Sequence, residues 1–344
     1  MNEKGASRVR AIHHHSVYLR HPASDAGGDP QGRVRPRLRA LRESASARPG
    51  AGAVGRIAVA YPGRDGAHSA AACDRLFPEA ELVPLASFTE VVAAAVDGSV
   101  RYGVLPIESS LVGPVAETHD LLYDSPLAIA DETILPIRHC LVGPEFVEPE
   151  RIREVRSHPV ALDQCRQLLA AMPRATPIAA GTTADAAAAV AELGDPEVAA
   201  IASERAAQLH GLVVLAGNVG DHPEAFTRFV AVAPYTRIDR PPGAWRTAFS
   251  FVTDHRPGAL HRAIEPFARH GIDLVQLVSR PIPGSAFRYR FDAVLGGHPL
   301  DAEIGSALAE VRALTRELRT FGSYPAAVAA SERPSPPAPA PARP

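Results

Sequence analysis

A short polar segment, Thr227-Arg228-Phe229, places three chemically capable side chains next to each other. It follows the turn-prone stretch 217–224 and leads into the apolar residues 229–232, so these groups stand at the start of an expected strand. A hydroxyl can donate a proton, and a guanidinium can hold a carboxylate through two parallel hydrogen bonds. Taken alone, the segment is also typical of two solvated side chains followed by one core residue.

Two other segments could bind an anion or a small ligand. Gly63 to Ser69 forms a glycine turn into an Ala-rich helix, whose first amides can attract a carboxylate or phosphate. It lacks the Lys-Ser/Thr pair of a nucleotide-binding loop, and an ordinary strand-to-helix turn has a similar composition. Glu108-Ser109-Ser110 follows a strand at the expected carboxyl edge of a sheet, where open α/β folds bind ligands, although a single loop carboxylate is usually solvated.

Two helix starts carry further polar groups. The segment 157–159, with Gln164 and Cys165 beyond it, fits either a ligand contact or a helix cap followed by a core cysteine. The pair 182–183 opens an Ala-rich helix that ends at Gly194, and its hydroxyls and amides suit capping or carboxylate binding.

These segments alternate with elements of regular structure. Short apolar strands are expected at 56–61, 103–107, 127–130, 137–142, 198–201 and 229–232. Ala-rich or amphipathic helices lie between several of them. Strands alternating with helices predict an α/β architecture with a mostly parallel sheet.

A second unit follows the Pro-rich linker 240–243. Apolar alternation predicts strands at 249–251, 272–277 and 289–295. Helical spacing predicts one helix that ends before Gly271. A final amphipathic helix is expected through Ile304, Leu308, Val311 and Leu318. The order βαββα, with or without a last short strand, predicts a small antiparallel sheet with both helices on one face.

Composition excludes several classes of protein. The 344 residues include 36 basic and 38 acidic ones, so there is no electrostatic case for nucleic-acid binding. Cys73, Cys140 and Cys165 form no CxxC pair, which argues against a zinc site or disulfide framework and fits a reducing compartment. No apolar run approaches the roughly 18 residues of a membrane span, and the N-terminus lacks the apolar core of a secretory signal. We therefore expect a cytoplasmic protein with no bound metal and no membrane or nucleic-acid partner.

The two ends of the chain differ from its middle. Residues 1–53 are rich in Arg, Gly, Pro and Ser with little apolar periodicity, so we expect a disordered arm. The histidine tract 13–15 and the arginines within 33–39 could bind a metal or a polyanion, but a solvated arm explains both. Residues 326–344 are expected to be a disordered Ala/Pro-rich tail.

Taken together and in order, these segments resemble the prephenate dehydratase family. The matching motifs of the first unit lie at 61–72, 103–115, 157–165, 183–187, 200–212 and 227–229. In the second unit, 257–260, 279–281 and 322–325 resemble the phenylalanine-binding and closing motifs of an ACT domain. The resemblance implies a two-lobed catalytic domain, like a periplasmic binding protein, over 54–240. It also implies a small α+β regulatory ACT domain of βαββαβ order over 246–325.

The resemblance further implies conversion of prephenate to phenylpyruvate, with loss of water and carbon dioxide, in phenylalanine biosynthesis. Because the aromatic ring forms within the substrate, the enzyme needs only a proton donor at the leaving hydroxyl and a cradle for two carboxylates. No metal or redox cofactor is then required. Thr227 is the implied proton donor, and Glu108 and Gln164 would orient it or the substrate.

Two groups of binding residues follow from the same resemblance. The expected substrate contacts are Ala67, His68, Ser69, Ser109, Ser110, Ser157, Thr182, Thr183, Arg228 and Phe229. The expected contacts to allosteric L-phenylalanine are Gly258, Ala259, Leu260, Ser279, Arg280 and Pro281. In ACT domains of this kind the ligand lies between subunits, so a homodimer or homotetramer is expected.

Four positions depart from the family's pattern. Ser109 replaces an Asn, Val160 a Gln and Ala225 an Asn, and these changes bear on efficiency or on substrate identity. Val278 replaces the Glu of the second ACT segment, so weak binding of phenylalanine is expected. Arogenate dehydratase or prephenate decarboxylase on the same fold, and a non-catalytic amino-acid-sensing protein, remain alternatives.

Overall fold

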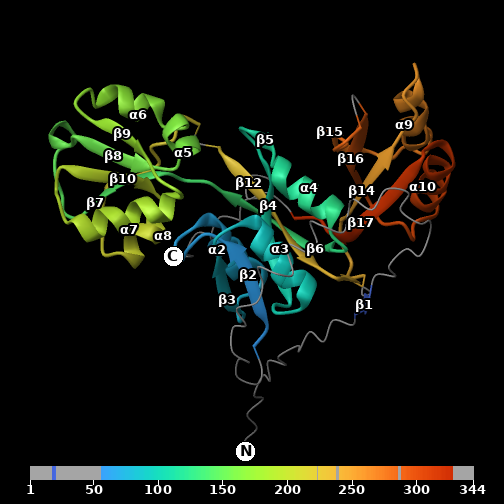
Figure 1. Ribbon diagram of the computed structural model, residues 1–344, viewed down its shortest axis with the longest axis horizontal. Coiled ribbons are helices and arrows are strands. Elements are labelled where there is room, and N and C mark those ends of the chain that lie inside the picture. The colour runs from blue at the N-terminus through green and yellow to red at the C-terminus, as the bar shows by residue number, and fades with distance from the viewer. Residues whose placement is uncertain (1–17, 21–55, 223, 238–239, 286–287, 328–344) are drawn as a thin grey trace, which may run out of the picture.

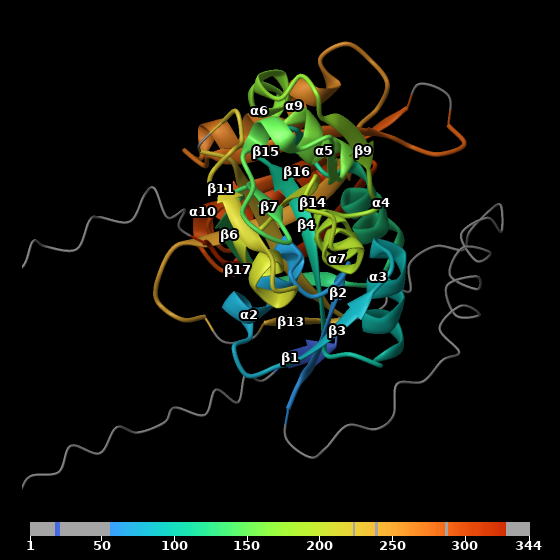
Figure 2. The same ribbon diagram turned by 90° about the vertical axis from the view of Figure 1, so that its left-hand side faces the viewer.

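The computed structural model describes residues 18–20, 56–222, 224–237, 240–285 and 288–327. Three larger sheets define a first lobe, a second lobe and a C-terminal unit, which lie in a row with the first lobe in the middle (Figure 1). Viewed along that row, the second lobe covers much of the other two units (Figure 2). The first lobe therefore has two interfaces, one at each end.

The first lobe contains a sheet of order β3-β2-β4-β12-β6, with the short β5 added to β4. Its strands are β2 (Ala58–Pro62), β3 (Glu81–Leu85), β4 (Tyr102–Ser109), β5 (Gly113–Pro114), β6 (Ala128–Pro136) and β12 (Phe226–Ala233). Its helices are α2 (His68–Leu76), α3 (Phe88–Asp97) and α4 (Ala116–Asp124). One apolar cluster packs under α2, and another lies between the sheet, α3 and the C-terminal unit.

The second lobe contains a sheet of order β11-β7-β10-β8-β9. Its strands are β7 (Cys140–Gly143), β8 (Glu154–Ser157), β9 (Thr176–Ala179), β10 (Val198–Ala202) and β11 (Val213–Ala216). Its helices are η1 (Pro149–Arg151), α5 (Pro159–Asp163), α6 (Arg166–Ala171), α7 (Thr183–Leu193) and α8 (Glu204–Leu209). Small alanines let α7 pack closely on β10, and α8 packs beside α7 and β11.

Both lobes have mixed sheets, so the expectation of a mostly parallel sheet is wrong. The chain leaves the first lobe after β6 and returns along β12, which runs antiparallel to both β6 and β4. The expected strand 137–142 is likewise divided, because 137–139 is the crossing between β6 and β7. The two crossings are tied together where the Val219 amide donates to the His139 carbonyl at 2.8 Å.

The C-terminal unit has the order βαββαβ, with the antiparallel sheet β15-β16-β14-β17. Its elements are β14 (Trp245–Val252), α9 (Ala259–Arg269), β15 (Leu274–Pro281), β16 (Tyr289–Gly296), α10 (Ala302–Leu314) and β17 (Glu317–Pro325). Both helices cover one face (Figure 1). Leu318 lies in β17 and not in the last helix, because α10 ends at Leu314 and the apolar pattern then continues with the period of a strand.

The other face of the C-terminal sheet packs on the first lobe. Ala248, Val294, Phe321 and Tyr324 join the same apolar cluster as Leu105 and other buried residues of the first lobe. At Gly322, an added Cβ would collide with the Ile129 carbonyl oxygen of β6. A glycine is therefore needed for the close approach of β17 to β6.

A short antiparallel ribbon pairs β1 (Tyr18–Arg20) with β13 (Tyr235–Arg237). β1 is the described part of the N-terminal arm. The histidine tract and the arginines of that arm, and the tail beyond 327, lie outside the described residues.

Candidate functional site

Thr227 lies inside β12, in the middle of three paired strands. It is opposite Ser109 of β4 and Leu135 of β6. Side chains of a strand alternate between its two faces, and residues paired across strands share a face. Phe229 belongs to the cluster under α2, whereas Val230 belongs to the cluster toward the C-terminal unit. Thr227 and Ser109 therefore share the α2 face, and Arg228 points to the opposite side.

On the α2 face, the start of α2 supplies backbone donors. Ala67 is the N-cap residue and makes no side-chain hydrogen bond to the helix amides that follow it. The loop after β4 is tied to β12, because the Phe226 amide donates to Ser110 Oγ at 2.9 Å. Ser109 Oγ accepts from the Leu111 amide at 3.3 Å. These contacts fix the two serines beside the start of β12.

Three residues from different parts of the chain come together near the lobe crossing. His68 of α2 and His139 of the crossing lie edge to face, with ring centroids 6.1 Å apart. The Nε2 of His139 is 2.9 Å from Oε1 of Gln164, which belongs to the second lobe. Burial, with a contribution from His139, lowers the pKa of His68 to about 4, and burial also lowers the pKa of His139. Both rings are therefore neutral near pH 7.

His139 was not identified from the sequence. It lies within the segment 137–142, which was expected to be an apolar strand, and has no distinctive spacing to Gln164, so only the folded chain reveals the contact.

The lobes meet through the glycine turn. Ser203 Oγ of the second lobe donates to the Gly66 carbonyl at 2.8 Å. Gly66 has φ +87°, and a Cβ there would press on Ala206 of α8. Arg64 Nε lies 2.8 Å from Asp185 Oδ1. The lobes are thus held by polar contacts at a turn that only glycine fits without strain.

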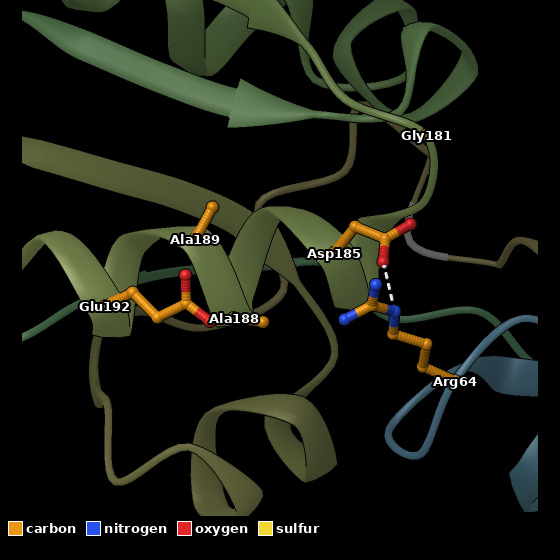
Figure 3. Close-up of a pocket in the computed structure, with 6 residues that line it drawn as sticks. All are labelled: Arg64, Gly181, Asp185, Ala188, Ala189 and Glu192. Atoms are coloured by element: carbon orange, nitrogen blue, oxygen red, sulfur yellow. Dashed lines mark ion pairs between the residues drawn. The ribbon is translucent and has the colours of Figure 1, made fainter.

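The predicted helix start at Thr182 and Thr183 lies beside this contact. Thr182 caps α7, since its hydroxyl accepts from the Asp185 amide at 2.9 Å and donates to the Asp185 carboxylate at 2.8 Å. An open pocket there is lined by Arg64, Gly181, Asp185, Ala188, Ala189 and Glu192 (Figure 3). In that view the Arg64 and Asp185 side chains point toward each other. None of the residues predicted to act on a substrate lines this pocket.

Arg228 is engaged with carboxylates of the protein. Its Nη1 lies 3.3 Å from Glu108 Oε2, and its Nε lies 3.8 Å from Glu132 Oε2. Glu108 pairs with Arg228 across β4 and β12, so both side chains occupy the face away from Thr227. In this arrangement Arg228 neutralises Glu108.

Two predicted contact residues lie in the interior. Ser157 is fully buried, and its hydroxyl donates to the Ile201 carbonyl at 2.6 Å. Phe229 is buried in the cluster under α2. These positions fit roles in holding β8 to β10 and in packing the first lobe.

The predicted regulatory segments lie on separate elements of the C-terminal unit. Gly258 is the N-cap of α9, with φ 76°, and Ala259 and Leu260 follow it in the first turn. Ser279, Arg280 and Pro281 end β15. Arg280 Nη2 lies 2.6 Å from Asp120 Oδ2 of α4, so this arginine also contacts the first lobe.

Among the described residues, no group of three or more His, Cys, Asp or Glu side chains is arranged to hold a metal. In the same part of the chain, no helix has the length and apolar character that a membrane span needs.

Comparison with known proteins gives a consistent result. A family model described as prephenate dehydratase matches residues 59–236. The bifunctional chorismate mutase/prephenate dehydratase of Aquifex aeolicus (strain VF5) is 34% identical over 276 residues, covering 79% of this chain and 75% of the relative. The chloroplastic arogenate dehydratase/prephenate dehydratase 1 of Arabidopsis thaliana is 34% identical over 284 residues, covering 78% of this chain and 72% of the relative. The crystal structure of an Arthrobacter aurescens prephenate dehydratase in complex with L-Phe superposes with a TM-score of 0.73 at 29% identity, covering 82% of this chain and 94% of that one.

Proposed function

The chain belongs to the prephenate dehydratase family, and we propose that it converts prephenate to phenylpyruvate, water and carbon dioxide. The observation that carries this proposal is the pairing of Thr227 with Ser109 on the sheet face that also holds the start of α2. Two hydroxyls and the start of α2, which has no side-chain cap, therefore belong to the same face of this sheet.

In this reaction Thr227 donates the proton to the leaving hydroxyl. The ring C–O bond breaks and the hydroxyl leaves as water. The bond to the ring carboxylate breaks at the same time, its electron pair enters the ring, and carbon dioxide leaves. One proton is consumed overall, and solvent returns it to Thr227. A neutral hydroxyl is a weak acid, so the contribution of Thr227 rests on its position at the leaving group.

The amides of His68 and Ser69 at the start of α2 suit one substrate carboxylate, because helix N-termini attract anions. Gln164, which hydrogen-bonds to His139, would contact the substrate from the second lobe. Thr182 and Thr183 stand at the start of α7, next to the Arg64–Asp185 contact between the lobes, and would bind the substrate from the second lobe. Glu108 and Arg228 act as a pair that fixes the adjoining ends of β4 and β12.

We also propose that the C-terminal unit is an ACT domain that binds L-phenylalanine and inhibits the reaction, within phenylalanine biosynthesis. The Arthrobacter aurescens relative was crystallised with L-Phe, which supports this proposal. Gly258 and the end of β15 would contribute from different subunits, so the active form is a homodimer or homotetramer. We assign the catalytic domain to 54–240 and the ACT domain to 246–325, in a cytoplasmic enzyme.

One assay tests the proposal against its alternatives. Prephenate and arogenate are supplied separately, phenylpyruvate is followed by its ultraviolet absorbance, and phenylalanine is followed by chromatography. We expect phenylpyruvate from prephenate and little product from arogenate. Faster formation of phenylalanine from arogenate would favour the arogenate dehydratase, which the name of the Arabidopsis relative includes. Carbon dioxide release without an aromatic product would indicate a decarboxylase, and no turnover of either would favour a sensing protein.

A further inference from the structure

One buried carboxylate, Glu132 of β6, joins the C-terminal unit to the strand that carries Thr227. Its side chain has no exposed surface. Its Oε1 accepts from the Arg246 guanidinium of β14 and, at 2.8 Å, from the Ala327 amide. Both of these donors follow the second lobe in sequence and belong to the C-terminal part of the chain. This oxygen is therefore occupied by that part of the molecule.

The other oxygen of Glu132 faces the first lobe and is not satisfied. Among the described residues no donor hydrogen-bonds to Glu132 Oε2, and Arg228 Nε is also buried without an acceptor. These two atoms lie 3.8 Å apart. A charge-assisted hydrogen bond between them needs an approach of only about 1 Å. Buried groups of this kind are costly to leave unpaired, so a small displacement that joined them would be favourable.

Arg228 continues the connection toward the candidate site. Its Nη1 lies 3.3 Å from Glu108, and it directly follows Thr227 in β12. Charges of opposite sign thus alternate from Arg246 through Glu132 and Arg228 to Glu108. Tyr324 of β17 is fully buried and pairs with Arg246 across the C-terminal sheet, so the Arg246 end of this row lies against a buried ring.

We propose that Glu132 is a positioning residue for Arg228, and that Arg246 of the C-terminal unit determines how Glu132 divides its hydrogen bonds. With Arg246 in place, as observed, Glu132 Oε2 attracts Arg228 Nε from 3.8 Å while Arg228 Nη1 stays paired with Glu108. If Arg246 moves away from Glu132, the Glu132 carboxylate hydrogen-bonds to Arg228 instead, and Arg228 leaves Glu108. This movement shifts the end of β12 at Thr227. This inference rests on the proposed function of Thr227.

The charge of Glu132 depends on its neighbours. Burial raises its pKa, and Arg246 and Arg228 act against that shift. A neutral glutamine of the same shape therefore removes the electrostatic connection with little change in packing.

The test compares Glu132→Gln, Arg246→Gln and the double variant with the parent, using prephenate. The matched control is Arg316→Gln, which removes an exposed pair with Asp254 in the same unit. We expect Glu132→Gln and Arg246→Gln each to lower kcat about tenfold with KM changed less than about threefold, since network residues alter coupling on this scale. The kcat of the double variant should be no lower than that of the slower single variant, and the kcat of the Arg316→Gln control should equal that of the parent.

Two results would overturn the inference. One is a parent-like kcat for Glu132→Gln accompanied only by a lower melting temperature, which means a purely structural role. The other is multiplication of the two single effects in the double variant. If Glu132→Gln does not fold, Arg246→Lys replaces it, because this variant keeps the charge but changes the donors that reach Glu132.

A second readout needs no substrate and separates this inference from the proposed function. Urea unfolding of Glu132→Gln, Arg228→Lys and their combination measures whether the two residues interact. Additive losses of stability would overturn the inference even if prephenate is turned over. Non-additive losses would support the contact even if the parent does not act on prephenate.

Discussion

The first lobe has two interfaces of different kinds. Its contact with the second lobe is polar and partly exposed: Arg64, which pairs with Asp185, has 70% of its side chain exposed. Arg205 of the second lobe pairs with Asp74 of α2, again with partly exposed side chains. Exposed ion pairs contribute little to stability.

The contact with the C-terminal unit is apolar and contains a buried group of charges. The side chain of Arg290 in β16 is 1% exposed. It pairs with Asp292 of the same strand and with Asp120 of α4 in the first lobe. Its guanidinium also lies over the Tyr123 ring, 4.2 Å from the centroid. His119 Nδ1 is 3.2 Å from Asp292 Oδ2. The continuous apolar cluster surrounds these groups.

This difference indicates which parts of the molecule can move. Interfaces with few apolar contacts open at low free-energy cost, whereas large apolar ones do not. We infer that the second lobe opens and closes around the substrate, while the C-terminal unit stays on the first lobe. A conformational change in the C-terminal unit would then affect the candidate site through strands β6 and β12 and not through the contact between the two lobes.

The largest expected effect comes from breaking the buried charge group. Arg290→Gln removes the guanidinium that pairs with Asp292, and loss of one partner of a buried ion pair costs about 3–5 kcal/mol. Urea unfolding measures this loss. The matched control Arg269→Gln, on the exposed surface of α9, should leave the unfolding midpoint unchanged. An equal midpoint for Arg290→Gln and the parent would show that the cluster does not hold the interface.

A smaller effect is expected on the affinity for phenylalanine when Val278 is replaced by Glu. The parent should bind it weakly, and Val278→Glu should strengthen binding by about one to two powers of ten, because a hydrogen bond to a charged group contributes on the order of 1.5–3 kcal/mol. Val278 lies opposite Asp292 and two residues from Arg280, so the new carboxylate would have an arginine near it. Calorimetric titration measures the affinity. Micromolar binding by the parent would show that this position does not set it.

The two interfaces should lose stability in different ranges of pH. The pKa of His68 is held at about 4, below the value of roughly 6.5 in an unfolded chain. The unfolded state therefore takes up the proton first, and on the order of 1–3 kcal/mol is lost as pH falls from about 6.5 to 4. Burial acts to raise the pKa of Asp292, but His119 and Arg290 outweigh it and hold that pKa low.

The stability contributed by Asp292 is accordingly present above about pH 4 and is lost only below it. Unfolding measured from pH 8 to pH 3 should show both ranges, and His68→Gln should reduce the upper one, to which His139 also contributes because burial lowers its pKa. A slope between pH 6.5 and 4 that is as steep in His68→Gln as in the parent would show that His68 does not contribute to it.

The smallest effect is expected at Ser109. Asn offers an amide donor and a carbonyl acceptor where Ser has one hydroxyl, so Ser109→Asn should preserve or raise kcat/KM for prephenate. Ser110→Asn is the matched control, because the Ser110 hydroxyl is already bonded to the Phe226 amide and an Asn there should not help. Loss of turnover in Ser109→Asn would indicate a pocket adapted to another substrate.

Much of the fold could be predicted from local patterns. The βαββαβ order of the C-terminal unit and the Gly194 end of α7 follow from apolar periodicity and from glycine at a helix end, and both are confirmed. The antiparallel course of β12 was not predicted. It depends on the chain returning from the second lobe, a long-range event that leaves no local signal.

The residues of the candidate site could be named from separate motifs, but which of them lie together could not be predicted. Strand alternation predicts that Thr227 and Arg228 point to opposite faces of the sheet. The residues that surround them on those faces come from β4, β6 and β14, which are far apart in sequence. In the sequence, Glu132 is an ordinary polar residue just beyond the expected strand 127–130, although β6 extends to Pro136. Its importance emerges only when Arg246, more than a hundred residues later, is placed against it.

The central claim is that Thr227 carries the proton transfer on the α2 face of β12. Steady-state turnover of prephenate by the parent, Thr227→Ala and Thr227→Ser tests it most directly. We predict that kcat falls by about 10²–10⁴ in Thr227→Ala with KM little changed, and that Thr227→Ser keeps much of the parent activity because the hydroxyl remains. A kcat of Thr227→Ala equal to that of the parent would contradict the claim.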